Sequence, residues 1–276
     1  MSHETIKEAM LQRAVGKVDE GLLDYLIEEF NRVTFMAEDK LCYAAGCTKE
    51  DLHRMCEAFG AKSLLELMAL LREVVYRETE STHPAGERTL REIADTMMRY
   101  EMGNIAEFNT GVDFAMVDRL AQDLSTATEV YIVGVRSSAP MSIYAAHILS
   151  SAGIRTRKLD VAENYVDGVV NMDRAGLVLA LDFTRYHKGT LVLLNMLRKN
   201  GFNIAAITDS HDAPVARVAN YSICVPRHSH DYTDSFVTTT MLLNMLAIYI
   251  GMQDKDGLVN RLRQYDEITQ GLEFFF

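Results

Sequence analysis

Two short segments of the sequence combine hydroxyl and basic side chains, the groups that bind phosphate in proteins. The first follows an apolar run at residues 130–135 and contains Arg136, Ser137 and Ser138, with Pro140 close behind. Proline is common in the first turn of a helix, and the free N–H groups and positive dipole end of that turn attract anions. This segment is a candidate phosphate cradle; the alternative is that Ser138 merely caps its helix.

The second segment carries a wider range of chemical groups. It ends the apolar run at residues 176–183 and leads into a helical pattern from Lys188. Its candidate ligand-binding residues are Asp182, Thr184, Arg185, Tyr186, His187 and Lys188. Arg185 could form paired hydrogen bonds with a phosphate, and Lys188 could add positive charge. The alternative is a solvated loop with a capping threonine.

Two further groups of residues resemble metal ligands, and we interpret neither as a metal site. The His-x-His-Asp segment at residues 228–231 precedes an apolar helix and has the composition of a helix start. Cys47, His53 and Cys56 lack the Cys-x₂-Cys spacing of a zinc knuckle, and buried thiols in a helical core fit them better. We therefore expect no metal, no cofactor and four free cysteines.

The elements that must position these residues form an alternating pattern in the second half of the chain. Apolar runs at residues 130–135, 176–183, 203–208 and 221–225, with a weaker one at 154–159, predict five strands. Helical patterns at residues 140–151, 188–200 and 213–219 separate them. This alternation predicts an α/β fold with a doubly wound parallel sheet, in which ligands bind outside the carboxyl ends of the strands. Both candidate segments lie at such ends.

The first part of the chain has a different pattern. Leucine and isoleucine recur at helical spacing around residues 22–30 and 64–71, which predicts an all-helical domain over residues 1–80. A polar stretch with Pro84 and Gly86 indicates a linker, followed by a connecting helix, over residues 81–108. Residues 109–276 then form the α/β domain. Its final helices, at 236–250 and 258–272, would cover the sheet or form a contact between copies, so we expect a homodimer or homotetramer.

Composition limits the class of protein further. The chain has 276 residues, 48% of them apolar, and a net charge of −11. It has neither an apolar run long enough to span a membrane nor an apolar secretion signal at its start, so we expect a cytoplasmic protein with no membrane partner. An acidic chain binds nucleic acid only through a local basic patch or an uneven field in a dimer.

The C-terminal half resembles a SIS (sugar isomerase) domain. The resemblance rests on residues 132–138, residues 181–190, and Ala206-Ile207-Thr208-Asp209-Ser210 followed by Ala213-Pro214-Val215-Ala216. Across nearly its full length the chain is similar to the RpiR/MurR family of bacterial transcriptional regulators, which join a helix-turn-helix domain to a SIS domain that senses a sugar phosphate. The resemblance implies that the two hydroxyl-bearing segments bind such an effector.

The N-terminal half carries the other part of this resemblance. Leu41-Cys42-Tyr43-Ala44-Ala45-Gly46-Cys47-Thr48 is similar to the family's supporting helix and turn, which makes residues 48–60 the recognition helix. The residues that would contact DNA are Thr48, Lys49, Asp51, His53, Arg54 and Lys62.

The chain also departs from the family pattern. Asp51 stands where the family has threonine, Glu57 and Ala58 where it has basic residues, and residues 1–80 hold ten Lys and Arg against sixteen Asp and Glu. This balance predicts weak, salt-sensitive DNA binding, which a dimer could strengthen. In the second loop the family commonly has Ser-x-Ser-x-x-Thr, whereas Asp182 begins it here. Asp182 could pair with an arginine or hold a sugar hydroxyl or amine.

Three functions follow from these observations. The first is a non-enzymatic, sugar-phosphate-responsive transcriptional regulator that binds operator DNA. The second is a sugar-phosphate isomerase, for which His187, His230 or Asp182 would supply the general base. The third is an effector-binding protein whose helix-turn-helix no longer binds DNA.

Overall fold

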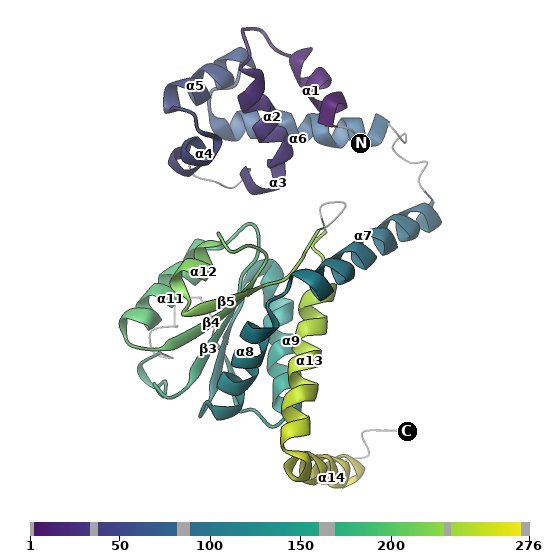
Figure 1. The fold of residues 1–276 in the computed structure, drawn as a ribbon, viewed down its shortest axis with the longest axis vertical. Coiled ribbons are helices and arrows are strands. Elements are labelled where there is room, and N and C mark those ends of the chain that lie inside the picture. The colour runs from purple at the N-terminus through teal and green to yellow at the C-terminus, as the bar shows by residue number, and fades with distance from the viewer. Residues whose placement is uncertain (1–2, 34–37, 82–88, 160–168, 229–232, 272–276) are drawn as a thin grey trace. The chain divides into compact units, whose positions relative to one another are not determined.

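The computed structural model describes residues 3–33, 38–81, 89–159, 169–228 and 233–271 (Figure 1). The chain divides into two compact units, Met1–Ala94 and Asp95–Phe276. Helix α7 (Leu90–Gly111) crosses the boundary between them, so much of the predicted connecting helix lies in the second unit. The predicted linker falls largely on residues outside the described ranges.

The N-terminal unit is helical, as its apolar periodicity predicts. Its helices are α1 (His3–Leu11), α2 (Glu20–Glu28), α3 (Phe30–Val33), α4 (Glu38–Ala45), α5 (Lys49–Ala58) and α6 (Leu64–Ser81). Their apolar faces meet in one core that includes Leu23, Leu26, Met55 and Leu67. Cys42 and Cys56 are buried in this core, whereas Cys47 is only partly buried; all four cysteines of the chain are described and are free thiols.

A tight turn joins α4 to α5 at the place where the sequence predicts one. Gly46 has a φ of +67°, a left-handed conformation that glycine adopts without the steric cost of a side chain. The Thr48 hydroxyl accepts a hydrogen bond from the Asp51 N–H, and the Asp51 carboxylate accepts one from the Thr48 N–H, which is a capping box. These bonds to Thr48, with an ion pair to Arg54, lower the pKa of Asp51 to about 2. Asp51 therefore stabilises the start of α5.

Replacing Thr48 by alanine is expected to lower the free energy of unfolding of the helical unit by about 1 kcal/mol, since α5 loses its hydroxyl cap. Hydrogen exchange of the α5 amides measures this loss. Thr48→Ser retains a hydroxyl and should exchange like the wild type. If the alanine variant exchanges like the wild type too, the cap contributes nothing.

The second unit is built on a five-stranded parallel sheet with strand order β2-β1-β3-β4-β5. The strands are β1 (Val130–Val133), β2 (Thr156–Leu159), β3 (Leu177–Leu181), β4 (Asn203–Thr208) and β5 (Tyr221–Cys224). The helices include α8 (Phe114–Thr126), α9 (Ala139–Ser151), α11 (Lys188–Lys199), α12 (Pro214–Val218), α13 (Val237–Gln253) and α14 (Lys255–Gly271). The predicted α/β fold and all five predicted strands are confirmed. None of the helices in the described part of the chain has the length and apolar character needed to cross a membrane.

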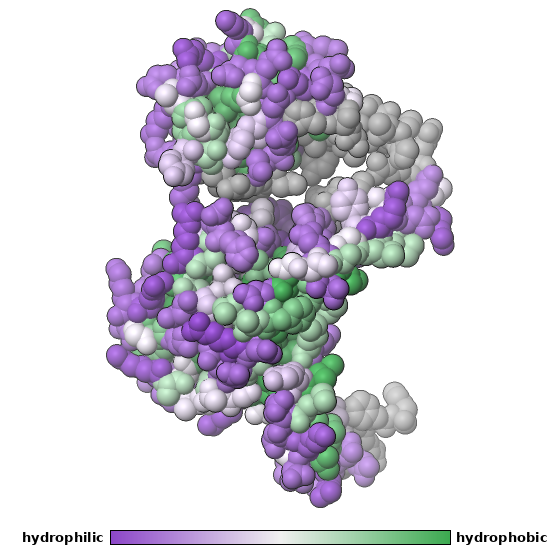
Figure 2. Space-filling view, in the orientation of Figure 1, coloured by the Kyte–Doolittle hydropathy of each residue, from purple (hydrophilic) through white to green (hydrophobic). Residues whose placement is uncertain are grey.

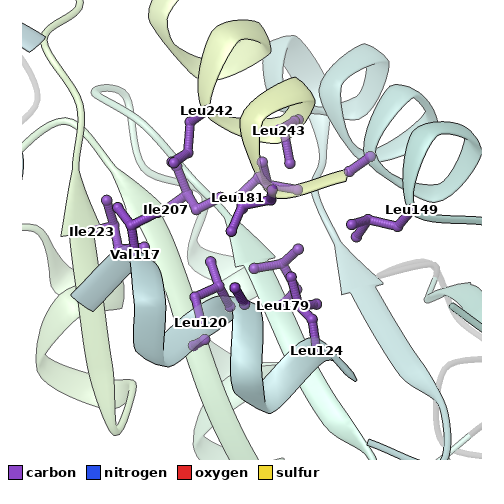
Figure 3. Close-up of a cluster of buried hydrophobic side chains, with 14 of the residues drawn as sticks. Val117, Leu120, Leu124, Leu149, Leu179, Leu181, Ile207, Ile223, Leu242 and Leu243 are labelled. Carbon is purple, nitrogen blue, oxygen red and sulfur yellow. The ribbon is translucent and has the colours of Figure 1, made fainter. Parts of the chain in front are cut away.

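Helices cover both faces of this sheet. Helices α8, α9 and α13 pack on one face, and α11 and α12 on the other (Figure 1). Figure 3 shows Leu120 of α8, Leu149 of α9 and Leu242 of α13 converging on strand residues such as Leu179 and Ile207. Because both faces are buried, β3 and β4 are nearly continuous apolar runs.

The strand register brings the two candidate segments to one edge of the sheet. Val133 lies opposite Ala180, and Leu181 lies opposite Ile207. Neighbouring parallel strands are about 4.8 Å apart, so the loops after β1, β3 and β4 begin side by side at the carboxyl edge.

Candidate functional site

The loop after β1 is shaped for a close approach between the backbone and the start of α9. A Cβ atom at Gly134 would lie 2.9 Å from the Ser138 carbonyl oxygen and from the Ser142 Cβ, so this position requires glycine. A short 3₁₀ turn covers Arg136–Ser138, with Arg136 exposed and Ser138 buried. Among the described residues, the Ser138 side chain forms no capping hydrogen bond with α9, so the interpretation of Ser138 as a simple cap is wrong.

The loop after β3 leads into α11, whose start also lacks a capping side chain within the described part of the chain. His187 stands at the N-cap position, so the alternative of a capping threonine is wrong too. Arg185 and Lys188 are exposed, and Arg185 has a φ of +77°. Residues with a Cβ atom seldom adopt this conformation, and surrounding contacts must hold it. The start of α11 thus offers free N–H groups beside two cationic side chains.

Asp209, which follows β4, fixes the shape of this second loop. Its carboxylate accepts a hydrogen bond of 2.7 Å from the Thr184 N–H and one of 2.8 Å from the Tyr186 hydroxyl. Burial, together with the charge of Asp209, raises the pKa of Tyr186 well above its ordinary value, so this phenol remains protonated. Tyr186 is therefore a structural donor in the loop.

Asp182 is a buried carboxyl group beneath the same loop, with 3% of its surface exposed. Its Oδ1 atom lies 3.5 Å from the donating His187 N–H, and its Oδ2 atom finds no hydrogen-bond partner among the residues that the structure describes. Burial raises the pKa of Asp182 to about 7, and the nearby charge of Asp209 adds to the shift. The suggested pair between Asp182 and an arginine is wrong, because Arg185 and Arg227 bind other carboxylates.

Arg227, in the segment after β5, holds these loops together. Its side chain is 4% exposed and forms ion pairs of 3.5 Å with Asp209 and 2.5 Å with Asp234. Its guanidinium also lies over the rings of Phe183 and Phe236, 4.8 and 4.7 Å from their centroids. The sequence identifies Arg227 only as part of a polar segment. Its partners follow three different strands, so only the folded chain shows this role.

The remaining candidates of this unit separate into two groups. His228 is exposed and its Nε2 atom lies 2.9 Å from the Glu107 carboxylate, whereas His230 and Asp231 lie outside the described residues. Within the described ranges, no group of three or more His, Cys, Asp and Glu side chains could hold a metal ion.

The candidate DNA-contacting side chains lie at the surface of the helical unit. Thr48, Lys49, His53, Arg54 and Lys62 are exposed. Three of them pair with carboxylates: Lys49 with Asp39 at 2.6 Å, His53 with Glu57 at 3.4 Å, and Arg54 with Asp51. A phosphate must compete with these carboxylates.

Comparison with known proteins agrees with this architecture. Residues 123–249 match the family model of the SIS domain. The C-terminal unit contains a SIS domain. The sugar isomerase domain of an RpiR transcription factor from Sphaerobacter thermophilus matches with a TM-score of 0.61 and 21% identity, over 64% of this chain and 99% of that one.

Two further structures share the fold. The NanR protein of Vibrio vulnificus, complexed with ManNAc-6P, matches over 98% of both chains with a TM-score of 0.67 and 14% identity. A protein of Escherichia coli CFT073, in complex with a sugar phosphate, matches over 60% of this chain and 92% of that one, with a TM-score of 0.54 and 18% identity. The first of these likenesses includes the helical unit as well as the SIS domain.

Proposed function

We propose that this protein is a transcriptional regulator whose SIS domain binds a phosphorylated sugar and whose helical unit binds DNA. One observation carries the effector part: two helices without capping side chains, α9 and α11, begin on neighbouring strands at one edge of the sheet. Their free N–H groups favour an anion. Ser137, Thr184 and Lys188 stand beside them, with Arg136 and Arg185 as further cations. The phosphosugars bound by two proteins of the same fold support this ligand class.

A thermal-shift screen tests the effector part directly. ManNAc-6P, arabinose-5-phosphate and other phosphorylated sugars are added to the full chain, with the unphosphorylated sugars as controls. A ligand that binds only the folded state raises the unfolding midpoint. Only the phosphorylated members should do so.

The DNA part follows from the helix-turn-helix resemblance and from the exposed residues of α5. Lys49, Arg54 and Lys62 would give six phosphate contacts in a homodimer. With six contacts, raising salt from 50 to 200 mM should lower the affinity about 10³-fold. Fluorescence anisotropy with a fragment of the protein's own promoter measures this slope.

A substitution in α5 tests which residues produce that slope. Arg54→Gln should reduce the slope by about two, one for each copy, whereas Lys255→Gln in α14 removes a cation from the other unit and should leave it unchanged. Equal effects of both variants would exclude α5 as the DNA-binding helix.

A homodimer is favoured by apolar side chains exposed on the C-terminal helices. Ile248, Met252, Val259, Leu262 and Ile268 are each more than half exposed. Figure 2 shows hydrophobic surface on α14 between polar residues. A second copy of the chain would remove this surface from water.

One observation favours isomerase activity as a second candidate. Asp182 has a pKa of about 7, which suits a general base at neutral pH, and it lies beneath the proposed sugar site. Turnover of arabinose-5-phosphate and related phosphosugars, followed by NMR, separates the two functions. Conversion that Asp182→Asn abolishes would establish the isomerase.

A further inference from the structure

Arg185, a cation of the proposed effector loop, is held by a carboxylate of the same unit. Its Nη2 atom lies 2.7 Å from Oδ2 of Asp234, and its side chain is 45% exposed. Its positive φ shows that contacts, and not backbone preference, maintain the loop conformation. An anion arriving at the loop must therefore compete with Asp234 for this guanidinium.

Asp234 is shared between two arginines. Its other oxygen, Oδ1, lies 2.5 Å from Nη2 of Arg227, which also pairs with Asp209. Two cations and two carboxylates therefore balance one another without a ligand. If Arg185 leaves for a phosphate, Asp234 remains paired with Arg227, so the exchange strands no buried charge.

The residues next to Arg227 and Asp234 are hydrogen-bonded to α7. The Ser235 hydroxyl donates to Glu101 at 2.7 Å. The side-chain amide of Asn104, which is fully buried, donates to the His228 carbonyl and accepts from the His228 N–H, both at 2.8 Å. Segments on either side of residues 229–232, which lie outside the described ranges, are thus fastened to the helix that crosses the boundary between the two units.

We propose that Asp234 is an internal competitor for Arg185, and that the phosphate group of the effector displaces it and so loosens the Asp234–Ser235 segment from α7. This inference rests on the proposed effector site. A ligand that favours the state with Arg185 released must shift α7 toward its loosened state. The reciprocal effect also holds: removing the competitor must favour the ligand.

Asp234→Asn tests both halves of this inference in the full chain. Titration calorimetry with ManNAc-6P and arabinose-5-phosphate should show binding three- to tenfold tighter than in the wild type. Hydrogen exchange of α7 between residues 101 and 108 should at least double when either sugar binds the wild type. In Asp234→Asn it should be fast already and should not respond.

Two further variants make the result specific. Asp212→Asn removes a surface carboxylate near Arg217, far along the chain from the network, and should behave like the wild type in both measurements. Ser235→Ala breaks the bond to Glu101 without touching Arg185, so it should keep the wild-type affinity within twofold and lose the α7 response.

The outcomes distinguish this inference from the proposed function. Unchanged or weaker binding by Asp234→Asn, or an α7 response that survives in both Asp234→Asn and Ser235→Ala, would overturn the inference while leaving effector binding intact. Failure of every phosphosugar to bind the wild type would overturn the effector site and the inference together.

Discussion

Replacing Arg227 by methionine is expected to lower the free energy of unfolding of the SIS domain by about 3 kcal/mol. Methionine fills part of the space between Phe183 and Phe236, but Asp209 and Asp234 lose the cation that pairs with both. Removing one partner from a buried ion pair costs about 3–5 kcal/mol, because the remaining charge is left in a poorly solvated place. We expect the lower value because Asp234 keeps Arg185 and Asp209 keeps two hydrogen bonds.

Native-state hydrogen exchange of the β3 and β4 amides measures this loss in the SIS domain alone. Arg217→Met is the matched control, since Arg217 is exposed and its nearest carboxylate, on Asp212, is 3.8 Å away. Its effect should stay within about 0.5 kcal/mol. Equal effects of the two substitutions would mean that Arg227 does not hold the loops together.

Asp182→Asn is expected to make the SIS domain more stable than the wild type at pH 8. The folded-state pKa of Asp182, about 7, lies above the ordinary value of 3.8, so the folded chain binds this proton more tightly than the unfolded chain does. The stabilisation that this proton brings is complete below about pH 4 and is lost as the pH rises through 7. A shift of about 3 units corresponds to at most about 4 kcal/mol. Asparagine carries no charge at any pH and avoids this loss.

Unfolding measured between pH 4 and 8 tests this expectation. The stability of Asp182→Asn relative to the wild type should rise across that range and level off near pH 8. Asp212→Asn, which removes an exposed carboxylate, should give a nearly flat difference. A flat difference for Asp182→Asn as well would show that Asp182 is ionised in the folded protein throughout.

The strands of the SIS domain could be predicted because burial on both faces gives them continuous apolar sequence. β3 reads Leu-Val-Leu-Ala-Leu and is buried at every position. β2, at the edge of the sheet, reads Thr-Arg-Lys-Leu and is buried only at Leu159, so its pattern is weaker, and the prediction began it two residues early. The carboxyl-edge position of both candidate loops followed from the strand order along the chain.

The charge network around Arg227 could not be predicted in the same way. Arg185 and Asp234 are 49 positions apart and meet only because the loops after β3 and β5 converge. A sequence pattern records local spacing, so it shows the hydroxyls of residues 136–138 but not which carboxylate each arginine binds. The competition between Asp234 and an anion for Arg185 is visible only in the folded chain.

The start of α5 shows a signal that was present but was interpreted differently. Thr48-x-x-Asp51 has the spacing of a capping box, which needs no knowledge of tertiary structure. Asp51 was instead considered as an acid facing DNA. Its bonds to Thr48 and Arg54 show that the departure from the family threonine supports the helix.

Titration calorimetry of the full chain with ManNAc-6P and arabinose-5-phosphate, in the wild type and in Ser138→Ala, Thr184→Val and Arg185→Ala, tests the effector site most directly. We expect one site per chain in the wild type and affinity at least tenfold weaker in each variant, because hydrogen bonds to a charged group contribute about 1.5–3 kcal/mol. Wild-type affinity in all three variants would contradict the placement of the anion between the loops after β1 and β3.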